Sequence, residues 1–239
     1  MPRFSEEGYE IIPNLLTTQQ VEWANTSLAE LIDQGFEGVQ YEVEVKDGTT
    51  QQHRRDLVRK ITHYTKENAY LKSLSLLPML LRSVETLLGE KAEMVVENAL
   101  LKPPLIGREK PWHQDTAIFD LPVDCPVVGA WIALDAADEE NGCMQVIPGS
   151  HKAGPTPHFM LKDWQLCDRD VTQEKAASIP LQPGDCLLWD GLLFHGSQPN
   201  RSTRRRRALQ FHYKPLSVPW ISKETRLKTF DGVLQGKTC

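Results

Sequence analysis

From residue 92 onward, short runs rich in Val, Ile, Leu and Trp alternate with turns that contain glycine or proline. Runs of this length at close spacing are typical of strands in an all-β sandwich or barrel. Clear turn signals stand at Asn141-Gly142, Pro148-Gly149 and Pro183-Gly184. The runs are 94–101, 127–134, 143–147, 177–181, 185–189 and 206–213. We therefore expect a mainly β chain with flanking helices and a jelly-roll, cupin-like core, the double-stranded β-helix.

The first 91 residues follow a different pattern. A short apolar segment at 9–12 predicts a strand, and Thr17 and Thr18 then precede apolar residues at helical spacing. A second helix is expected over about 69–88, with Gly89 ending it. Residues 36–66 are polar and interrupted by glycine, which predicts an irregular excursion that contributes a lid.

A chain of 239 residues is long enough for one sizeable core, and single β-barrel domains commonly reach this length. Hydrophobic residues make up 40% and charged residues 25%, which is the balance of an ordinary globular protein. We expect one domain over 1–239. It would consist of an N-terminal strand and helices (1–91), the β-helix core (92–215) and a C-terminal tail (216–239).

The net charge of −5 argues against nucleic acid as the main partner, because such binding depends on a basic surface. No stretch has the apolar length needed to cross a bilayer, and the start, MPRFSEEGYE, is acidic where a signal peptide would be apolar. We expect a cytoplasmic protein that acts on a small molecule, without a nucleic-acid or membrane partner. The five cysteines form no CxxC pair, so we expect reduced structural thiols.

Two residues of the motif PWHQD, His113 and Asp115, stand two positions apart. In a strand, residues at this spacing point to the same face, so both could reach one ion. His195, in LFHGSQ, lies eighty residues later and supplies a candidate third ligand. Two imidazoles and a carboxylate on one side of an ion leave positions open, as in iron(II) sites that activate dioxygen. A lone His-x-Asp pair is more often a surface hydrogen bond, and the same three ligands suit zinc or manganese in a non-oxidative cupin-like protein.

Arg206 follows the last of these histidines by eleven residues and begins a strand-like run. A guanidinium binds a carboxylate through two parallel hydrogen bonds and stays charged inside a barrel. By strand alternation Ala208 and Gln210 share its face, whereas Arg205 and Arg207 should point outward. Arg206 is therefore a candidate carboxylate anchor. The alternative for the arginine run is a solvated basic edge strand.

The other histidines, at 53, 63, 151, 158 and 212, lack this pairing, and we expect them to be structural. His151, in PGSH, is a candidate for the mouth of the site. The aromatic residues Trp112 and Phe119 stand near the proposed ligands in the sequence and are expected to exclude water there.

These motifs, taken in order, resemble a known family. NALLKPP, PWHQD, GAWIALDAADEENGCMQVIPGSHK, LQPGDCLLWDGLLFHGS and RRALQFHY are similar to segments of the phytanoyl-CoA dioxygenase family of iron and 2-oxoglutarate oxygenases. The opening FSEEGYEIIPNLLTTQQV also resembles the N-terminal strand and helix of that family, so the resemblance covers most of the chain. It implies that His113, Asp115 and His195 hold iron(II), and that Arg206 and Ser197 bind the distal carboxylate of 2-oxoglutarate.

The resemblance implies further contacts to the cosubstrate. Trp131 would pack beside 2-oxoglutarate, and Lys60, in RKITHY, resembles a second basic contact that some members place before the core. Asn98 and Lys102 alternate with Leu100 along one strand face, so they either line the pocket or form an ordinary polar strand edge.

The family reaction consumes dioxygen and 2-oxoglutarate and releases succinate and carbon dioxide. Halogenases on this scaffold lack the ligand carboxylate, so the presence of Asp115 favours hydroxylation. The prime substrate is expected to be selected by 36–66 and 152–176, whose sequences do not indicate what they bind.

Overall fold

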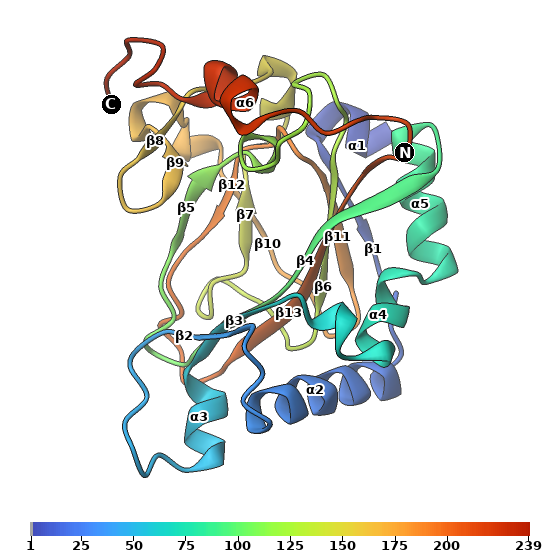
Figure 1. Ribbon diagram of the computed structural model, residues 1–239, viewed down its shortest axis with the longest axis vertical. Helices are drawn as coiled ribbons and strands as arrows, with labels where there is room; N and C mark the ends of the chain where they lie inside the picture. Colours follow the sequence, from blue (N-terminus) through green and yellow to red (C-terminus); the bar gives the residue numbers. More distant parts are fainter. Residues whose placement is uncertain (1) are drawn as a thin grey trace.

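Two antiparallel β-sheets face each other in the computed structural model, which describes residues 2–239 (Figure 1). The larger sheet has the strand order β1-β11-β6-β13-β4-β3-β2, and the smaller has the order β10-β7-β12-β5. Strands distant in the sequence thus become neighbours, as in a jelly roll. The double-stranded β-helix expected from the sequence is confirmed.

The strands of the larger sheet are β1 (Tyr9–Ile12), β2 (Val39–Tyr41), β3 (Val58–Thr62), β4 (Ala92–Lys102), β6 (Val128–Ala133), β11 (Cys186–Asp190) and β13 (Arg206–Pro215). Those of the smaller sheet are β5 (Lys110–His113), β7 (Met144–Val146), β10 (Ala177–Ile179) and β12 (His195–Ser197). A separate hairpin is formed by β8 (His158–Met160) and β9 (Trp164–Leu166). The helices are α1 (Pro2–Glu7), α2 (Thr18–Asp33), α3 (Gln51–Leu57), α4 (Ala69–Ser75), α5 (Pro78–Leu88) and α6 (Lys223–Phe230).

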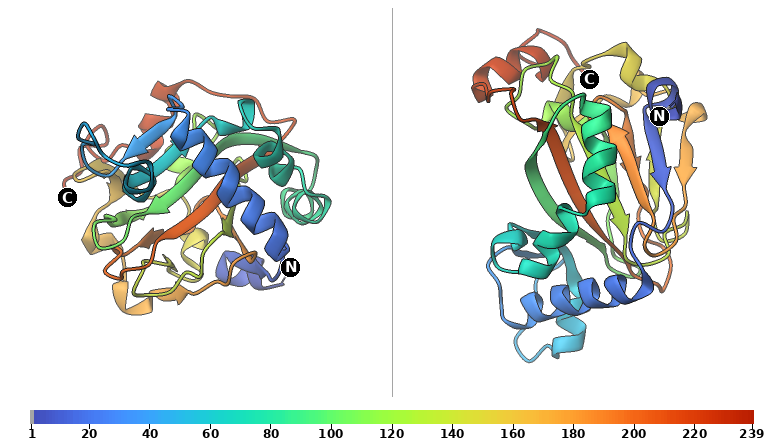
Figure 2. Two further views of the ribbon diagram at one scale, coloured as in Figure 1. Left: turned by 90° about the horizontal axis from the view of Figure 1, so that it is seen from below. Right: turned by 90° about the vertical axis from the view of Figure 1, so that its right-hand side faces the viewer.

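Helices cover the outer face of the larger sheet, as the right-hand view of Figure 2 shows. The helix α2 begins with a capping box, in which Thr17 accepts a hydrogen bond from the Gln20 backbone and the Gln20 side chain binds the Thr17 backbone. Its apolar stripe is buried with residues of α4 and α5 against alternate residues of the sheet. This packing fixes the outer face, so the opposite face of the same strands points into the barrel.

The expected helix over 69–88 is two helices. The chain leaves α4 at Ser75 and begins α5 with Pro78 at its first position. Proline disfavours helical geometry in the residue before it, and Leu77 is accordingly extended, with φ −54° and ψ 129°. Gly89 then ends α5 in the left-handed region, with φ 77°, as the sequence indicates.

The expectation that 36–66 is irregular is wrong. This segment contains β2, α3 and β3, and β3 extends the larger sheet by pairing with β4, with Lys60 opposite Leu100 and Thr62 opposite Asn98. The open edge of a long strand supplies unpaired backbone groups, and a polar segment with weak periodicity is ordered by pairing with it.

The space between the sheets is apolar on the side of β11, β6 and β7. Buried side chains that share this interior include Tyr9, Trp131, Met144, Val146, Leu187, Trp189 and Ala208. In residues 2–239, no helix is long and apolar enough to cross a membrane.

The expectation of five reduced cysteines is wrong for one pair. Cys167 and Cys239 form a disulfide with their Cα atoms 5.5 Å apart. The C-terminal segment returns to the β8–β9 hairpin, where Gly232 N–H donates to the His158 carbonyl at 3.0 Å, and this return brings the two thiols together. The remaining three cysteines, 125, 143 and 186, are free and buried, as expected.

Candidate metal centre

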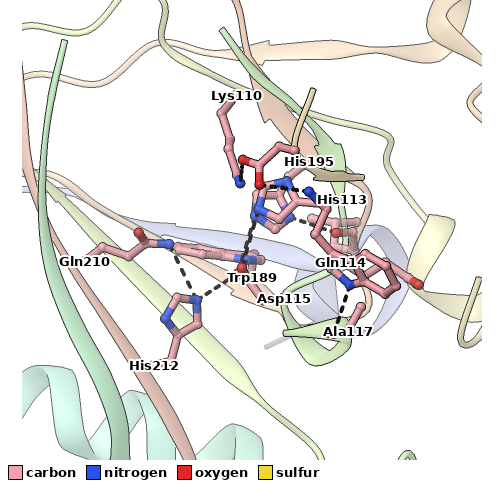
Figure 3. Close-up of polar contacts among 12 residues, drawn as sticks. Lys110, His113, Gln114, Asp115, Ala117, Trp189, His195, Gln210 and His212 are labelled. Carbon is pink, nitrogen blue, oxygen red and sulfur yellow. Dashed lines mark hydrogen bonds and ion pairs between the residues drawn. The ribbon is translucent and has the colours of Figure 1, made fainter. Parts of the chain in front are cut away.

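His113, Asp115 and His195 converge in the interior of the barrel (Figure 3). His113 ends β5 and His195 begins β12, and these two residues are directly paired in the smaller sheet. Their ring centroids are 4.1 Å apart. One ligand atom from each of the three residues lies within 4.8 Å of the others, and all three residues are buried. The structure therefore brings together the three expected ligands.

Asp115 reaches the site by a route that the sequence did not indicate. Strand β5 ends at His113, and Asp115 opens a short 3-10 turn (Asp115–Ala117), so strand alternation does not align the two side chains. Gln114 lies between them and points away. Its side-chain nitrogen donates to the carbonyls of Gly154 at 2.9 Å and Leu192 at 2.7 Å. This anchored residue sets the corner that turns Asp115 inward.

The hydrogen bonds of the two ligand histidines fix their tautomers. Nδ1 of His113 lies 2.9 Å from the Pro111 carbonyl, and Nδ1 of His195 lies 2.9 Å from the Leu193 carbonyl. A carbonyl only accepts, so each Nδ1 carries the hydrogen and each Nε2 presents a lone pair to the site. Burial, and then the proximity of His195, lower the pKa of His113 to about 4, which keeps this imidazole neutral and able to bind a metal.

The carboxylate of Asp115 is surrounded by nitrogen atoms. Its Oδ1 lies 3.5 Å from His113 Nε2, and its Oδ2 lies 3.3 Å from His195 Nε2. Oδ2 also accepts hydrogen bonds from Trp189 Nε1 at 3.0 Å and His212 Nε2 at 2.7 Å. Burial alone would raise the pKa of this carboxyl, but the neighbouring histidines outweigh burial and hold the pKa well below its usual value. The aspartate is therefore ionised.

His212 was expected to be structural, but it contacts the metal site. It lies on β13 on the same face as Arg206, Ala208 and Gln210. Extending the alternation noted for those residues by two positions would have placed it inside the barrel. Its ring packs edge-on against Phe119, with centroids 4.9 Å apart, so Phe119 does lie beside the site as expected.

Arg206 is buried inside the barrel, with 4% of its surface exposed. Its guanidinium carbon lies over the Trp131 ring, and its Nε atom is buried with no hydrogen-bond partner among residues 2–239. Burial lowers its pKa to about 10, which leaves it charged at neutral pH. Its neighbours point outward as expected, because Arg205 pairs with Asp56 and Arg207 pairs with Asp135.

Three other candidate residues face the same interior. Ser197 lies two positions after His195 on β12, and Asn98 lies opposite Gln210 on β4. The Oδ1 of Asn98 and the Nε1 of Trp131 are buried without a hydrogen-bond partner in the described chain. Buried polar atoms are normally paired, so these orphan groups indicate a place where a polar ligand binds.

The two candidate lysines differ in their surroundings. Lys102 donates to the backbone carbonyls of Ser197, at 3.2 Å, and Gln198, and burial, with the nearby Arg206, lowers its pKa to about 6. Lys60 is partly buried, and its pKa is lowered by burial and then by Lys110. Lys102 thus ties β4 to β12.

Two residues that were expected near the metal site lie elsewhere. Trp112 packs outside the barrel in a cluster with Ile147, Leu166 and Phe194, because it alternates with the inward-facing His113. The expectation that it shields the metal site is wrong. His151 packs against α1, with its Nε2 3.3 Å from the Ser5 carbonyl.

The turn that carries Asp115 is also held from outside the barrel. Arg226 of α6 donates from Nη1 to the carbonyls of Ala117 at 2.8 Å and Ile118 at 2.6 Å. Its Nε lies 3.0 Å from Asp120 Oδ1. The C-terminal helix therefore braces the segment that follows the ligand carboxylate.

The residues present fit an iron ion and a small acid. Two neutral imidazoles and one carboxylate are a usual donor set for non-haem iron(II), and the unpaired guanidinium suits a carboxylate. Residues 4–208 match the family model of phytanoyl-CoA dioxygenase (PhyH). The chain belongs to the phytanoyl-CoA dioxygenase family. The resemblance stated from the sequence is thus confirmed.

Individual proteins are similar to this chain in sequence or in fold. The peroxisomal phytanoyl-CoA dioxygenase of Rattus norvegicus is 27% identical over 236 residues, covering 92% of this chain and 68% of the rat protein. EvdO2 from Micromonospora carbonacea var. aurantiaca, complexed with 2-oxoglutarate, has a TM-score of 0.72 and 24% identity, covering 96% of this chain and 95% of EvdO2. The epimerase SnoN, in complex with Fe3+ and alpha ketoglutarate, has a TM-score of 0.74 and 19% identity, and the match covers 92% of this chain and 84% of SnoN. These two structures contain the kinds of cofactor expected from the sequence.

Proposed function

We propose that this protein is an iron(II) and 2-oxoglutarate-dependent dioxygenase that hydroxylates a small molecule. The observation that carries the proposal is the buried Arg206, which has no acidic partner in the described chain and shares the barrel interior with a complete metal triad. A buried charge without a partner is costly, so its position is explained by an anionic ligand that pairs with it.

Each ligand of the triad has a defined role in holding iron. His113 and His195 would bind through Nε2, because their Nδ1 atoms are committed to backbone carbonyls. Asp115 would supply the negative charge. Bound iron(II), with 2-oxoglutarate and dioxygen, supplies the oxidation of an unactivated C–H bond and yields succinate and carbon dioxide, chemistry that side chains alone cannot perform.

The chain's own residues would bind and orient the cosubstrate. Arg206 would grip its distal carboxylate, with Ser197 donating a hydrogen bond and Trp131 packing along the acid. Trp131 lies on β6 beside the β13 strand of Arg206. Asn98 and Lys102 would line the same pocket. Holding both ends of a small diacid fixes its orientation to the metal and lowers the entropic cost of reaction.

Lys60 stands apart from these contacts as a second basic group. It projects from β3, and the charges of Lys110, Asp163 and Asp115 act on its ammonium. We infer that it contacts an anionic group of the cosubstrate or the prime substrate. The prime substrate would be selected by the segments 36–66 and 152–176.

The whole chain is proposed to be one oxygenase domain, in which 92–215 supplies the core and the flanking parts support it. Helix α6 follows the core and still contacts the metal turn through Arg226, which supports a single unit. The cytoplasmic location and the absence of nucleic-acid and membrane partners stay predictions from the sequence.

Release of label from 2-oxoglutarate tests the function directly. The purified protein is incubated with iron(II), ascorbate and 2-oxoglutarate labelled at C1. Labelled carbon dioxide and unlabelled succinate are then measured. His113→Ala and Asp115→Ala should abolish the iron-dependent release, whereas Trp23→Phe, on the outside of α2, should not change it. Unchanged succinate formation in the first two variants contradicts the assignment.

Measuring metal and 2-oxoglutarate binding by the purified protein tests the non-oxidative cupin-like alternative. If the chain binds zinc or manganese at the triad but neither binds nor consumes 2-oxoglutarate, non-oxidative chemistry or ligand binding replaces the oxygenase proposal. The buried Arg206 favours the oxygenase, because a metal hydrolase has no need of a diacid anchor.

A further inference from the structure

Two side chains that are not metal ligands converge on one oxygen of Asp115. Trp189 Nε1 and His212 Nε2 both donate to Oδ2, at 3.0 Å and 2.7 Å (Figure 3). The other oxygen, Oδ1, has no such donor within residues 2–239. Both oxygens border the metal site, since Oδ1 lies 3.5 Å from His113 Nε2 and Oδ2 lies 3.3 Å from His195 Nε2. Both oxygens are therefore placed to bind a metal, but only Oδ2 accepts hydrogen bonds from these two donors.

The positions of the two donors are set by a glycine between them. Trp189 on β11 and His212 on β13 both lie opposite Gly129, which stands on the intervening strand β6. A Cβ at Gly129 would lie 2.3 Å from Cε2 of Trp189, so only glycine leaves room for the indole. The two rings meet with centroids 5.5 Å apart and planes at 86°. This edge-to-face contact fixes both rings.

The surroundings of His212 also support a donor role for Nε2. Its Nδ1 is buried with no hydrogen-bond partner in the described chain. A hydrogen on Nδ1 would be left buried and unpaired, whereas a hydrogen on Nε2 reaches Asp115. The register of β13 against β4 shifts directly after His212 because β4 has an extra residue there, Val95, whereas β13 pairs regularly with β6 at the same place. Regular strand alternation along β13 therefore directs the His212 ring into the barrel, at the carboxylate.

We propose that Trp189 and His212 are positioning residues that reserve Oδ2 of Asp115 for hydrogen bonding, so that the carboxylate binds the metal through Oδ1 alone. The inference rests on the proposed metal site. A carboxylate that chelated with both oxygens would occupy an additional coordination position. Binding through one oxygen keeps that position available for cosubstrate and dioxygen.

Cobalt(II) binding to the metal-free protein tests this role without turnover. Cobalt absorption falls in intensity as the coordination number rises, so it reports whether the carboxylate chelates. Trp189→Phe removes the N–H but keeps an aromatic ring, and His212→Leu removes the second donor. Each should weaken cobalt binding about tenfold and lower the absorbance per bound ion. His212→Gln, which restores an N–H group, should recover most of both signals.

Trp23→Phe is the matched control, because Trp23 lies on the outside of α2 and is 54% exposed. It should bind cobalt like the wild type. Thermal unfolding of the metal-free variants shows whether they fold, and if His212→Leu does not fold, Trp189→Phe carries the test.

The outcomes separate this inference from the proposed function. Wild-type affinity and spectrum in Trp189→Phe and His212→Leu would overturn the positioning role alone. A loss of affinity with an unchanged spectrum, not recovered by His212→Gln, would also overturn it, because the residues would then only support the fold. A wild-type protein that binds no cobalt, or an Asp115→Ala variant that binds it equally well, would contradict the metal site itself.

Discussion

Arg206 and Trp131 extend from adjacent strands, β13 and β6, and the guanidinium carbon lies 5.0 Å from the centroid of the Trp131 ring. The indole face stabilises the buried cation and leaves its hydrogen-bond donors free. The aromatic side chain thus keeps a charged side chain in place without using the groups that would bind a ligand.

Arg206→Ala should therefore weaken 2-oxoglutarate binding strongly. Loss of a bidentate, charge-assisted contact costs on the order of 2 to 4 kcal/mol, which corresponds to roughly 30-fold to 1000-fold in affinity. Titration of the cosubstrate into the metal-loaded protein measures the change. Arg205→Ala is the control, since that neighbour points outward to Asp56. Equal effects of the two substitutions would contradict the anchor assignment.

Gly129→Ala should damage both stability and metal binding. The added methyl group would meet the Trp189 ring at 2.3 Å, and overpacking of this kind costs about 1 to 3 kcal/mol of unfolding free energy. The displaced indole would also lose its hydrogen bond to Asp115. Denaturant unfolding and cobalt titration measure the two effects. A variant with wild-type stability would show that this part of the barrel relaxes easily.

Cys239→Ser should destabilise the protein through the loss of the disulfide to Cys167. The crosslink closes a loop with a sequence separation of 72 residues, for which chain entropy gives about 4 kcal/mol. Unfolding in denaturant, with and without a reducing agent, measures the difference. The reducing agent should lower the stability of the wild type to that of the variant and leave the variant unchanged. A wild type that is insensitive to reduction would contradict the prediction.

Lys102 should give the folded protein a distinct pH dependence. Burial lowers its pKa from the ordinary value of 10.5, which the unfolded chain keeps, to about 6 in the folded chain, so between these values the unfolded chain binds more protons. Stability therefore rises with pH across this window, by at most about 1.4 kcal/mol per pH unit. Lys102→Met should remove this rise while other groups keep their contributions. Unfolding free energies of the wild type and the variant, measured between about pH 6.5 and pH 9, inside this window, would give parallel curves if the prediction is wrong.

The barrel could be predicted because its long strands carry their own pattern. Along β13, Arg206, Ala208 and Gln210 alternate with outward residues, and both the strand and the inward direction of Arg206 follow from that alternation. The ligands His113 and His195 were found from their chemistry and spacing. Their strands, β5 and β12, are too short to show a period of their own.

What the sequence could not show depends on contacts between distant segments. The β3 strand forms because β4 offers an edge, and the Cys167 disulfide forms because the C-terminal segment folds back. The same applies to the hydrogen bonds of Trp189 and His212 with Asp115, which join three segments far apart in the chain. Local pattern carries no information about such partners.

The location of Asp115 in a 3-10 turn has a consequence for how this scaffold can change. The two imidazoles belong to paired strands, so altering their backbone would disturb the smaller sheet. The carboxylate stands just outside the strand pairing, in a corner braced by Gln114 and Arg226. The Asp115 side chain can thus be replaced without breaking hydrogen bonds between paired strands. Among the three ligands, the acidic one is the position where new metal chemistry can arise at the least structural cost.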